Sequence, residues 1–187
     1  MSAANAPERR GAGDSVSAAN APERRGSGDA VGTLLFRDVT LGLEVPPLSV
    51  EITPTLVVLG AIASRDWRPM HHDYAFAVHR QGVKDIFLNT PNQAAWFERY
   101  LTDWTGPHGR LGRMTFRMKS SVFPGDTMIL GGTVTTVEID DAGCGWAGLD
   151  LTMRVGDDVK TACSARVALP TTADDNPWAR RGERWRP

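Results

Sequence analysis

The chain has 187 residues, of which 41% are hydrophobic and 23% are charged, and its formal net charge is −1. This hydrophobic fraction supports one folded domain and excludes a largely disordered protein. A net charge near zero argues against nucleic-acid binding, and no apolar run approaches the roughly 20 residues of a membrane helix. Two cysteines do not form a disulfide framework, so we expect a protein of the reducing cytoplasm.

The first 31 residues are almost entirely a tandem duplication. Residues 2–16 and residues 17–31 are identical at 13 of 15 positions. Each copy has valine as its only large apolar residue, so it buries too little surface to offset the entropy of ordering. We therefore predict a disordered tail over residues 1–31, with an arginine-bearing docking arm as the alternative.

The other end of the chain is also polar. Residues 171–187 are bounded by prolines and predict a loose C-terminal tail. The rings of Trp178 and Trp185 in this segment are candidates for docking on the domain or on a partner. The folded domain is therefore expected to span residues 32–170.

The first predicted elements are a strand and a short helix. The segment from Leu48 to Leu59 is rich in β-branched residues and partly alternates, which favours a strand with an edge or bend at Pro54. A short helix is predicted over Tyr74–Gln81. Asp73 is a suitable N-cap for it and Gly82 a suitable stop.

The strongest helix signal covers Thr90–Trp104. Thr90 is a natural N-cap, Pro91 suits the first helical position, and Gln93 lies where it would complete a capping box. Apolar residues then recur on one face of the predicted helix, at Ala94, Phe97, Leu101 and Trp104.

The rest of the domain has the pattern of antiparallel strands. Four strands are expected, over residues 112–122, 127–139, 146–155 and 159–169. The first two are joined by Phe123-Pro-Gly-Asp126, whose residues suit a type II turn. Alternating apolar residues give these strands one buried face, which the long helix can cover. The sequence therefore predicts an α+β fold, an antiparallel sheet wrapped around a central helix.

Two motifs connect this architecture with a known family. Asp66-Trp-Arg-Pro-Met-His71, followed after five residues by Ala77, resembles the hydratase signature of the MaoC-like family. Val122-Phe-Pro-Gly-Asp126 resembles a turn of the same family, and the resemblance extends over residues 43–170. It implies the hot dog fold, in which subunits usually pair and sites lie at the dimer interface. The sequence is most similar to small MaoC-like subunits of actinobacterial acyl-CoA and steroid side-chain degradation, some of which are heteromeric.

The resemblance also implies an activity, the (R)-specific hydration of a trans-2-enoyl-CoA or the reverse dehydration. A medium or bulky acyl group, possibly a steroid side chain, is the expected substrate. Asp66 and His71 would hold and deprotonate a water, and a backbone N–H at the start of the long helix would stabilise the thioester enolate. Pro91 has no N–H, so the candidate donors for that oxyanion role are the amides of Asn89 and Thr90, with the amide of Asn92 as the less favoured alternative.

The sequence departs from the family signature beside this aspartate. Arg68 replaces an asparagine, and Arg65 stands where many members have glycine. Arg68 would either pair with Asp66 and lower its pKa or face the phosphates of CoA. We assign Arg68 to substrate binding, together with Trp96, which either packs in the core or lines an acyl tunnel.

Other readings of these residues stay open at this point. Asp66 and His71 could form only a structural turn, and the chain could be a non-catalytic subunit, a hot dog thioesterase or an acyl-CoA-binding regulator. His72 and His79 are too far apart along a helix to share one ion, so no metal is expected. No cofactor is expected either. The expected partners are the acyl-CoA substrate and a second hot dog subunit, as a homodimer or a heteromer.

Overall fold

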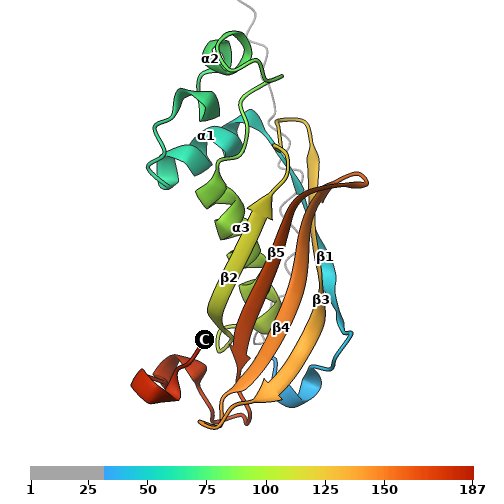
Figure 1. Cartoon of the computed structure of the whole chain (residues 1–187), viewed down its shortest axis with the longest axis vertical. Helices are drawn as coiled ribbons and strands as arrows, with labels where there is room; N and C mark the ends of the chain where they lie inside the picture. Colours follow the sequence, from blue (N-terminus) through green and yellow to red (C-terminus); the bar gives the residue numbers. More distant parts are fainter. Residues whose placement is uncertain (1–31) are drawn as a thin grey trace, which may run out of the picture. The chain divides into compact units, whose positions relative to one another are not determined.

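The computed structural model describes residues 32–187, so the duplicated segment of residues 1–31 lies outside the described residues. The central feature is a five-stranded antiparallel sheet with the strand order β1-β3-β4-β5-β2, against which the helix α3 packs (Figure 1). The strands are β1 (Glu44–Glu51), β2 (Arg110–Met118), β3 (Thr127–Ile139), β4 (Gly145–Val155) and β5 (Asp158–Leu169). The helices are α1 (Pro54–Ala63), α2 (Tyr74–His79) and α3 (Thr90–Thr105). The predicted α+β architecture is confirmed.

The core lies between α3 and the sheet. Phe97 and Leu101 of α3 are fully buried, and the buried Tyr100 donates its hydroxyl to the carbonyl of Val45 in β1, at 3.0 Å. Ala94 and Trp104, predicted for the same face, are half-buried. Alternating residues of β4 and β5 are buried as predicted, at Leu149, Leu151, Met153, Cys163, Ala165, Val167 and Leu169. The sheet and α3 thus share one buried core.

Several local predictions are confirmed. The side chain of Asp73 accepts from the backbone N–H of Phe76 and caps α2. In the predicted turn, Asp126 N–H donates to the carbonyl of Phe123 at 3.1 Å, and Gly125 has a φ of +85°, as a type II turn requires. No helix within residues 32–187 is both long and apolar enough to cross a membrane.

The strand predicted over Leu48–Leu59 is wrong in its second half. β1 ends at Glu51, and the helix α1 begins at Pro54. Thr53 accepts from the N–H of Leu56 and caps this helix, with proline in the first turn. The helix is apolar on all sides and therefore has no helical period, which is why its valines resemble a strand.

The predicted start of α3 is wrong by one residue. Asn89 is the N-cap, and its side-chain oxygen accepts from the N–H of Asn92 at 3.2 Å. Gln93 does not form a capping box. Its side-chain oxygen instead accepts from the hydroxyl of Thr161 in β5, within the core. Asn89 and Thr90 are both good N-cap residue types. A capping box on Thr90 would need the Gln93 side chain at the helix end, but this side chain is buried in the core, so Asn89 is the cap.

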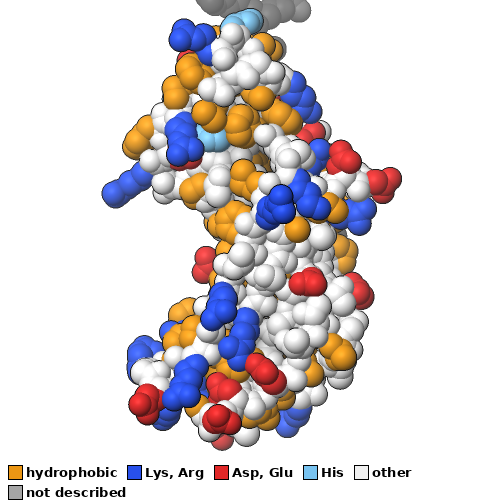
Figure 2. All heavy atoms as spheres, viewed as in Figure 1, with side chains coloured by type: hydrophobic (Ala, Val, Ile, Leu, Met, Phe, Trp, Pro, Cys, Tyr) orange, Lys and Arg blue, Asp and Glu red, His pale blue; other side chains and the backbone are white. Residues whose placement is uncertain are grey.

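The prediction of a loose tail over residues 171–187 is also wrong. The Trp185 ring packs on Trp146 of β4 at 5.0 Å between ring centroids, and the Arg110 guanidinium lies 3.5 Å above the Trp185 ring. Lys and Arg side chains gather where this segment packs (Figure 2). Tryptophan and arginine supply both the apolar area and the cation–π contacts that a short segment needs to dock.

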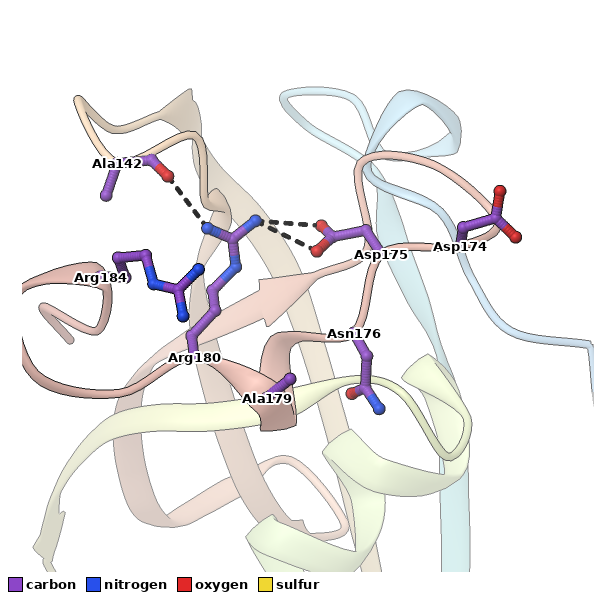
Figure 3. A pocket seen from close by; sticks show the side chains of 7 residues that line it. All are labelled: Ala142, Asp174, Asp175, Asn176, Ala179, Arg180 and Arg184. Carbon is purple, nitrogen blue, oxygen red and sulfur yellow. Dashed lines mark hydrogen bonds and ion pairs between the residues drawn. The ribbon is translucent and has the colours of Figure 1, made fainter.

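Arg180 fixes the same segment to the loop between β3 and β4. Its guanidinium pairs with Asp175 at 3.1 Å and donates to the carbonyl of Ala142 at 3.0 Å, beside a hollow of about 340 Å³ (Figure 3). Surrounding contacts lower the pKa of Asp175. Burial alone would raise it, but hydrogen bonds from Thr171 and the Arg180 pairing outweigh that effect.

We expect Trp185→Ala to destabilise the domain by about 1–2 kcal/mol, because it removes the aromatic and cation–π contacts that dock the C-terminal segment. Urea unfolding would measure the loss, and limited proteolysis would show earlier cleavage after Pro170. Leu41→Ala, at a side chain that is mainly exposed, is the control and should leave both unchanged. A Trp185→Ala variant as stable and as resistant as the wild type would contradict the docking.

Candidate active site

Asp66 is positioned by the C-terminal end of α1. The N–H of Arg65 donates to the carbonyl of Ile62 at 3.0 Å, and the N–H of Asp66 donates to the carbonyl of Ala61 at 2.9 Å. These two bonds form a Schellman motif, which satisfies the last carbonyls of a helix and sets the direction in which the chain leaves it. The carboxylate therefore starts from a fixed backbone position.

This motif requires a left-handed residue between the helix and Asp66. Arg65 occupies that place with a φ of +54°, and it is the one non-glycine residue with positive φ within residues 32–187. Glycine usually holds this position, because a Cβ in the left-handed region costs about 1 kcal/mol. The departure from glycine noted in the sequence therefore falls on a strained position.

His71 faces Asp66 from the short 3-10 helix Pro69–His71. Its Nδ1 lies 2.8 Å from the carbonyl oxygen of Phe87, which can only accept, so Nδ1 carries the proton in the neutral ring. Nε2 is then an acceptor that lies 3.6 Å from Oδ2 of Asp66. The imidazole is buried, and its ring meets the edge of Phe87.

The side chain of Asn89 connects this pair with the start of α3. Its Nδ2 donates to Oδ2 of Asp66 at 3.1 Å and to the hydroxyl of Ser64 at 2.8 Å, while its Oδ1 caps α3. The sequence analysis named Asn89 only for its backbone amide, as an oxyanion donor. It did not identify Ser64 as a partner of the Asn89 side chain. An asparagine directly before Thr-Pro is the signal for the cap, but nothing in the sequence indicates its second contact.

The hydrogen bonds around Asp66 lower its pKa. Burial by itself would raise that pKa, but the bonds from Asn89 and from the N–H of Arg68, with the charges of His71 and Arg68, outweigh it. The carboxylate is therefore ionised at neutral pH. Because its folded pKa lies below the usual 3.8, Asp66 stabilises the fold above that pH. This contribution is lost as the pH falls through the folded value.

The two amides named for the oxyanion are placed at the N-terminus of α3. Within residues 32–187, the backbone N–H groups of Asn89 and Thr90 have no acceptor. Asn89 is buried and Thr90 is exposed. The side chain of Asn89 joins this helix end to Asp66.

The two predicted substrate-binding residues lie differently. The Arg68 side chain is 74% exposed, and its Nε is 3.9 Å from Oδ1 of Asp66, so the ion pair is weak. Trp96 packs half-buried against the core further along α3, with Arg99 over its ring at 5.0 Å. Arg68 therefore borders the pair, whereas Trp96 lies against the core further along the helix.

The arrangement suits one water molecule and no metal ion. In the neutral form of the ring, Nε2 of His71 is an acceptor like Oδ2 of Asp66, so a water beside the pair, within hydrogen-bond reach of both atoms, would donate one hydrogen to each. Such a water is oriented and has two possible bases. Among the described residues, no group of three or more His, Cys, Asp or Glu side chains could hold a metal.

Comparison with known proteins was made by sequence and by structure. No family model matches the sequence. One curated relative is the 3-oxo-4,17-pregnadiene-20-carboxyl-CoA hydratase beta subunit of Mycobacterium tuberculosis. It is 38% identical over 96 residues, which cover 51% of this chain and 74% of the relative.

Solved structures with the same fold include a complex and a single enzyme. The ChsH1-ChsH2 complex from Mycobacterium tuberculosis has a chain that is 27% identical, with a TM-score of 0.63 over 70% of this chain and 98% of that one. The (R)-hydratase from A. caviae involved in PHA biosynthesis is 24% identical, with a TM-score of 0.64 over 72% and 99%. These neighbours establish the hot dog fold.

We expect Arg65→Gly to stabilise the protein by about 0.5–1 kcal/mol, because glycine relieves the left-handed strain and loses only part of this gain to unfolded-state entropy. The shift of the urea midpoint at unchanged slope would measure it. Arg65→Ala keeps a Cβ and should be less stable than Arg65→Gly. A glycine variant less stable than the wild type would show that this backbone is not strained.

We expect Asn89→Ala to raise the pKa of Asp66, because the carboxylate loses its side-chain donor. Titration of the Asp66 carboxyl by NMR would measure the change. Asn89→Ser is the matched control, since a serine can cap α3 but is too short to replace the amide. The pKa should rise in both variants, while stability falls mainly in Asn89→Ala. An unchanged pKa in both would contradict the role of Asn89.

Proposed function

The chain belongs to the MaoC-like family of hot dog hydratases, and on this basis we propose that it adds water to a trans-2-enoyl-CoA with (R) specificity, or catalyses the reverse dehydration. The observation that carries the proposal is the facing pair of acceptors, Oδ2 of Asp66 and Nε2 of His71, at 3.6 Å. A hydratase must hold and deprotonate a water, and this pair is suited to both tasks.

In the proposed reaction, Asp66 and His71 accept a proton from the water and later donate it to the substrate. The oxygen of the held water forms a bond to the β-carbon of the enoyl group, and one of its protons passes to Asp66 or His71. The proton is then delivered to the α-carbon, so that one water has been added and the pair is restored. The fixed Nδ1–H donor to Phe87 supports this role, because it keeps Nε2 available to receive a proton.

Negative charge develops on the thioester oxygen between these two steps. We assign its stabilisation to the backbone N–H groups of Asn89 and Thr90, at the positive end of α3. Asn89 supports this assignment because its side chain holds Asp66 while its backbone N–H has no acceptor among the described residues. Asn89 would then position both the carboxylate that activates the water and the backbone N–H groups that bind the oxyanion.

The acyl group is proposed to be medium or bulky, possibly a steroid side chain. The curated relative is named for a pregnadiene carboxyl-CoA, which is a large fused-ring substrate. Large apolar side chains are exposed on and beside α1 and α2, close in sequence to Asp66, namely Leu59, Ile62, Trp67 and Tyr74. An apolar acyl group would cover such side chains. Arg68 would face the CoA part and Trp96 the acyl part.

The active form is proposed to be a dimer, or a heteromer with a second MaoC-like subunit. β2 has a neighbouring strand on one side only among the described residues, and its nine residues contain no proline. By contrast, Pro46 and Pro47 interrupt the other edge strand, β1, where the register shifts. A relative at 27% identity is a chain of a two-protein complex.

A non-catalytic subunit is the second candidate function, because that solved relative comes from a complex of two different proteins. The complete Asp66–His71 pair within this one chain favours the catalytic role, since a subunit that only shapes a pocket has no need of it. Assays of the chain alone and with a co-encoded MaoC-like subunit would separate the two.

We expect Asp66→Asn and His71→Ala each to lower the rate of enoyl-CoA hydration by roughly 10²- to 10⁴-fold, the usual contribution of a positioned acid or base. Loss of enoyl absorbance would measure the rate, and a thiol reagent would detect any free CoA, which a thioesterase would release instead. His72→Ala is the control, because this exposed imidazole has its one hydrogen bond within residues 32–187 with the carbonyl of Trp67. Full activity in a chain carrying both site substitutions would rule out the assignment.

A further inference from the structure

We infer that Arg65 binds the phosphate groups of the CoA substrate, an inference that rests on the proposed function. The first observation is its backbone. Arg65 is the one non-glycine residue with positive φ among the described residues, at the position of a Schellman motif that glycine fills best. Strained backbone positions cluster at functional sites, so this residue is a candidate for a functional role of its side chain.

The second observation is the free charge of that side chain. Arg65 is exposed and forms no ion pair or side-chain hydrogen bond with any of residues 32–187. The guanidinium therefore contributes no ion pair or hydrogen bond among the described residues that would explain the strain. It is a planar group with several N–H donors, and such a group suits phosphate oxygens.

The third observation is the place of this charge. Arg65 directly precedes Asp66, and the largely exposed Arg68 follows two residues later, so two arginines flank the partly buried carboxylate. Arginine and lysine side chains stand near a histidine at the end of the molecule that α1 and α2 form (Figure 2). A thioester held at Asp66 and His71 leaves its phosphate-bearing portion outside, on this basic rim.

The test compares substrates that share one enoyl group and differ in phosphate. The thioesters are those of CoA, of 3′-dephospho-CoA and of pantetheine, which has no phosphate. Arg65→Gln removes the charge and keeps the strain, Arg65→Gly removes both, and Arg65→Lys keeps the charge. Arg184→Gln, at an exposed arginine of the C-terminal segment, is the matched control. Each full-length variant is assayed alone and with its co-encoded subunit.

We expect Arg65→Gln and Arg65→Gly to raise KM for the CoA thioester by about three- to tenfold, as loss of one charge-assisted contact to phosphate does. The values of kcat, and KM for the pantetheine thioester, should stay unchanged. Arg65→Lys should retain most of the affinity. The wild-type KM for CoA thioesters should rise with ionic strength, and less so in Arg65→Gln. An effect on dephospho-CoA would place the contact at the pyrophosphate, and an effect only on CoA would place it at the 3′-phosphate.

An equal rise of KM for the CoA and pantetheine thioesters would overturn the inference, because the residue would then act on the acyl part or on the fold. Unchanged KM values in Arg65→Gln with normal turnover would also overturn it, while leaving the proposed function intact. Binding of adenosine 3′,5′-bisphosphate by calorimetry is the readout without turnover. Weaker binding in Arg65→Gln would support the inference even if no enoyl thioester were hydrated, and equal binding or no wild-type binding would refute it.

Discussion

The side chain of Asn89 is the contact on which the site depends, because it joins the end of one helix to the start of another. Its amide donates to Asp66 and to Ser64 at the end of α1, and its carbonyl caps α3. A buried amide must satisfy its donors, so each contact limits the positions of the others. The distance between the carboxylate and the backbone donors of α3 is therefore set by one rigid group.

The larger fold provides the support that this group needs. α3 is held against the sheet by fully buried side chains such as Phe97 and Leu101, so its N-terminus has little freedom to move. α1 is short and ends in two hydrogen bonds that close its last turn, which fixes the backbone of Asp66. Catalytic groups positioned by packed helices are better aligned than groups on free loops.

The sequence predicted the larger elements and the identity of the facing pair, but not the contacts that orient it. The strands from Thr127 to Leu169 alternate between apolar and polar residues because one face is buried. This two-residue period can be recognised within each short segment of sequence. The start of α1 was missed because an all-apolar helix has no period. The second contact of Asn89 was missed because it joins residues 23 positions apart, at Asp66, and no local pattern records such a pair. For the same reason, the sequence offered Trp178 and Trp185 as docking candidates but did not indicate Trp146 and Arg110, the distant residues against which Trp185 packs.

The pair itself is arranged in a way that favours a bound donor. With Nδ1 of His71 committed to the carbonyl of Phe87, its Nε2 and Oδ2 of Asp66 are two acceptors facing each other in a largely buried place. Two lone pairs at 3.6 Å do not attract, and an anion out of water needs donors. Asn89 and the N–H of Arg68 supply part of that need, and a water or a substrate hydroxyl can supply the rest. The proposed hydration and the proposed dehydration both require such an oxygen, held by its hydrogens. The same two acceptors would therefore orient a water in one direction and the leaving hydroxyl in the other.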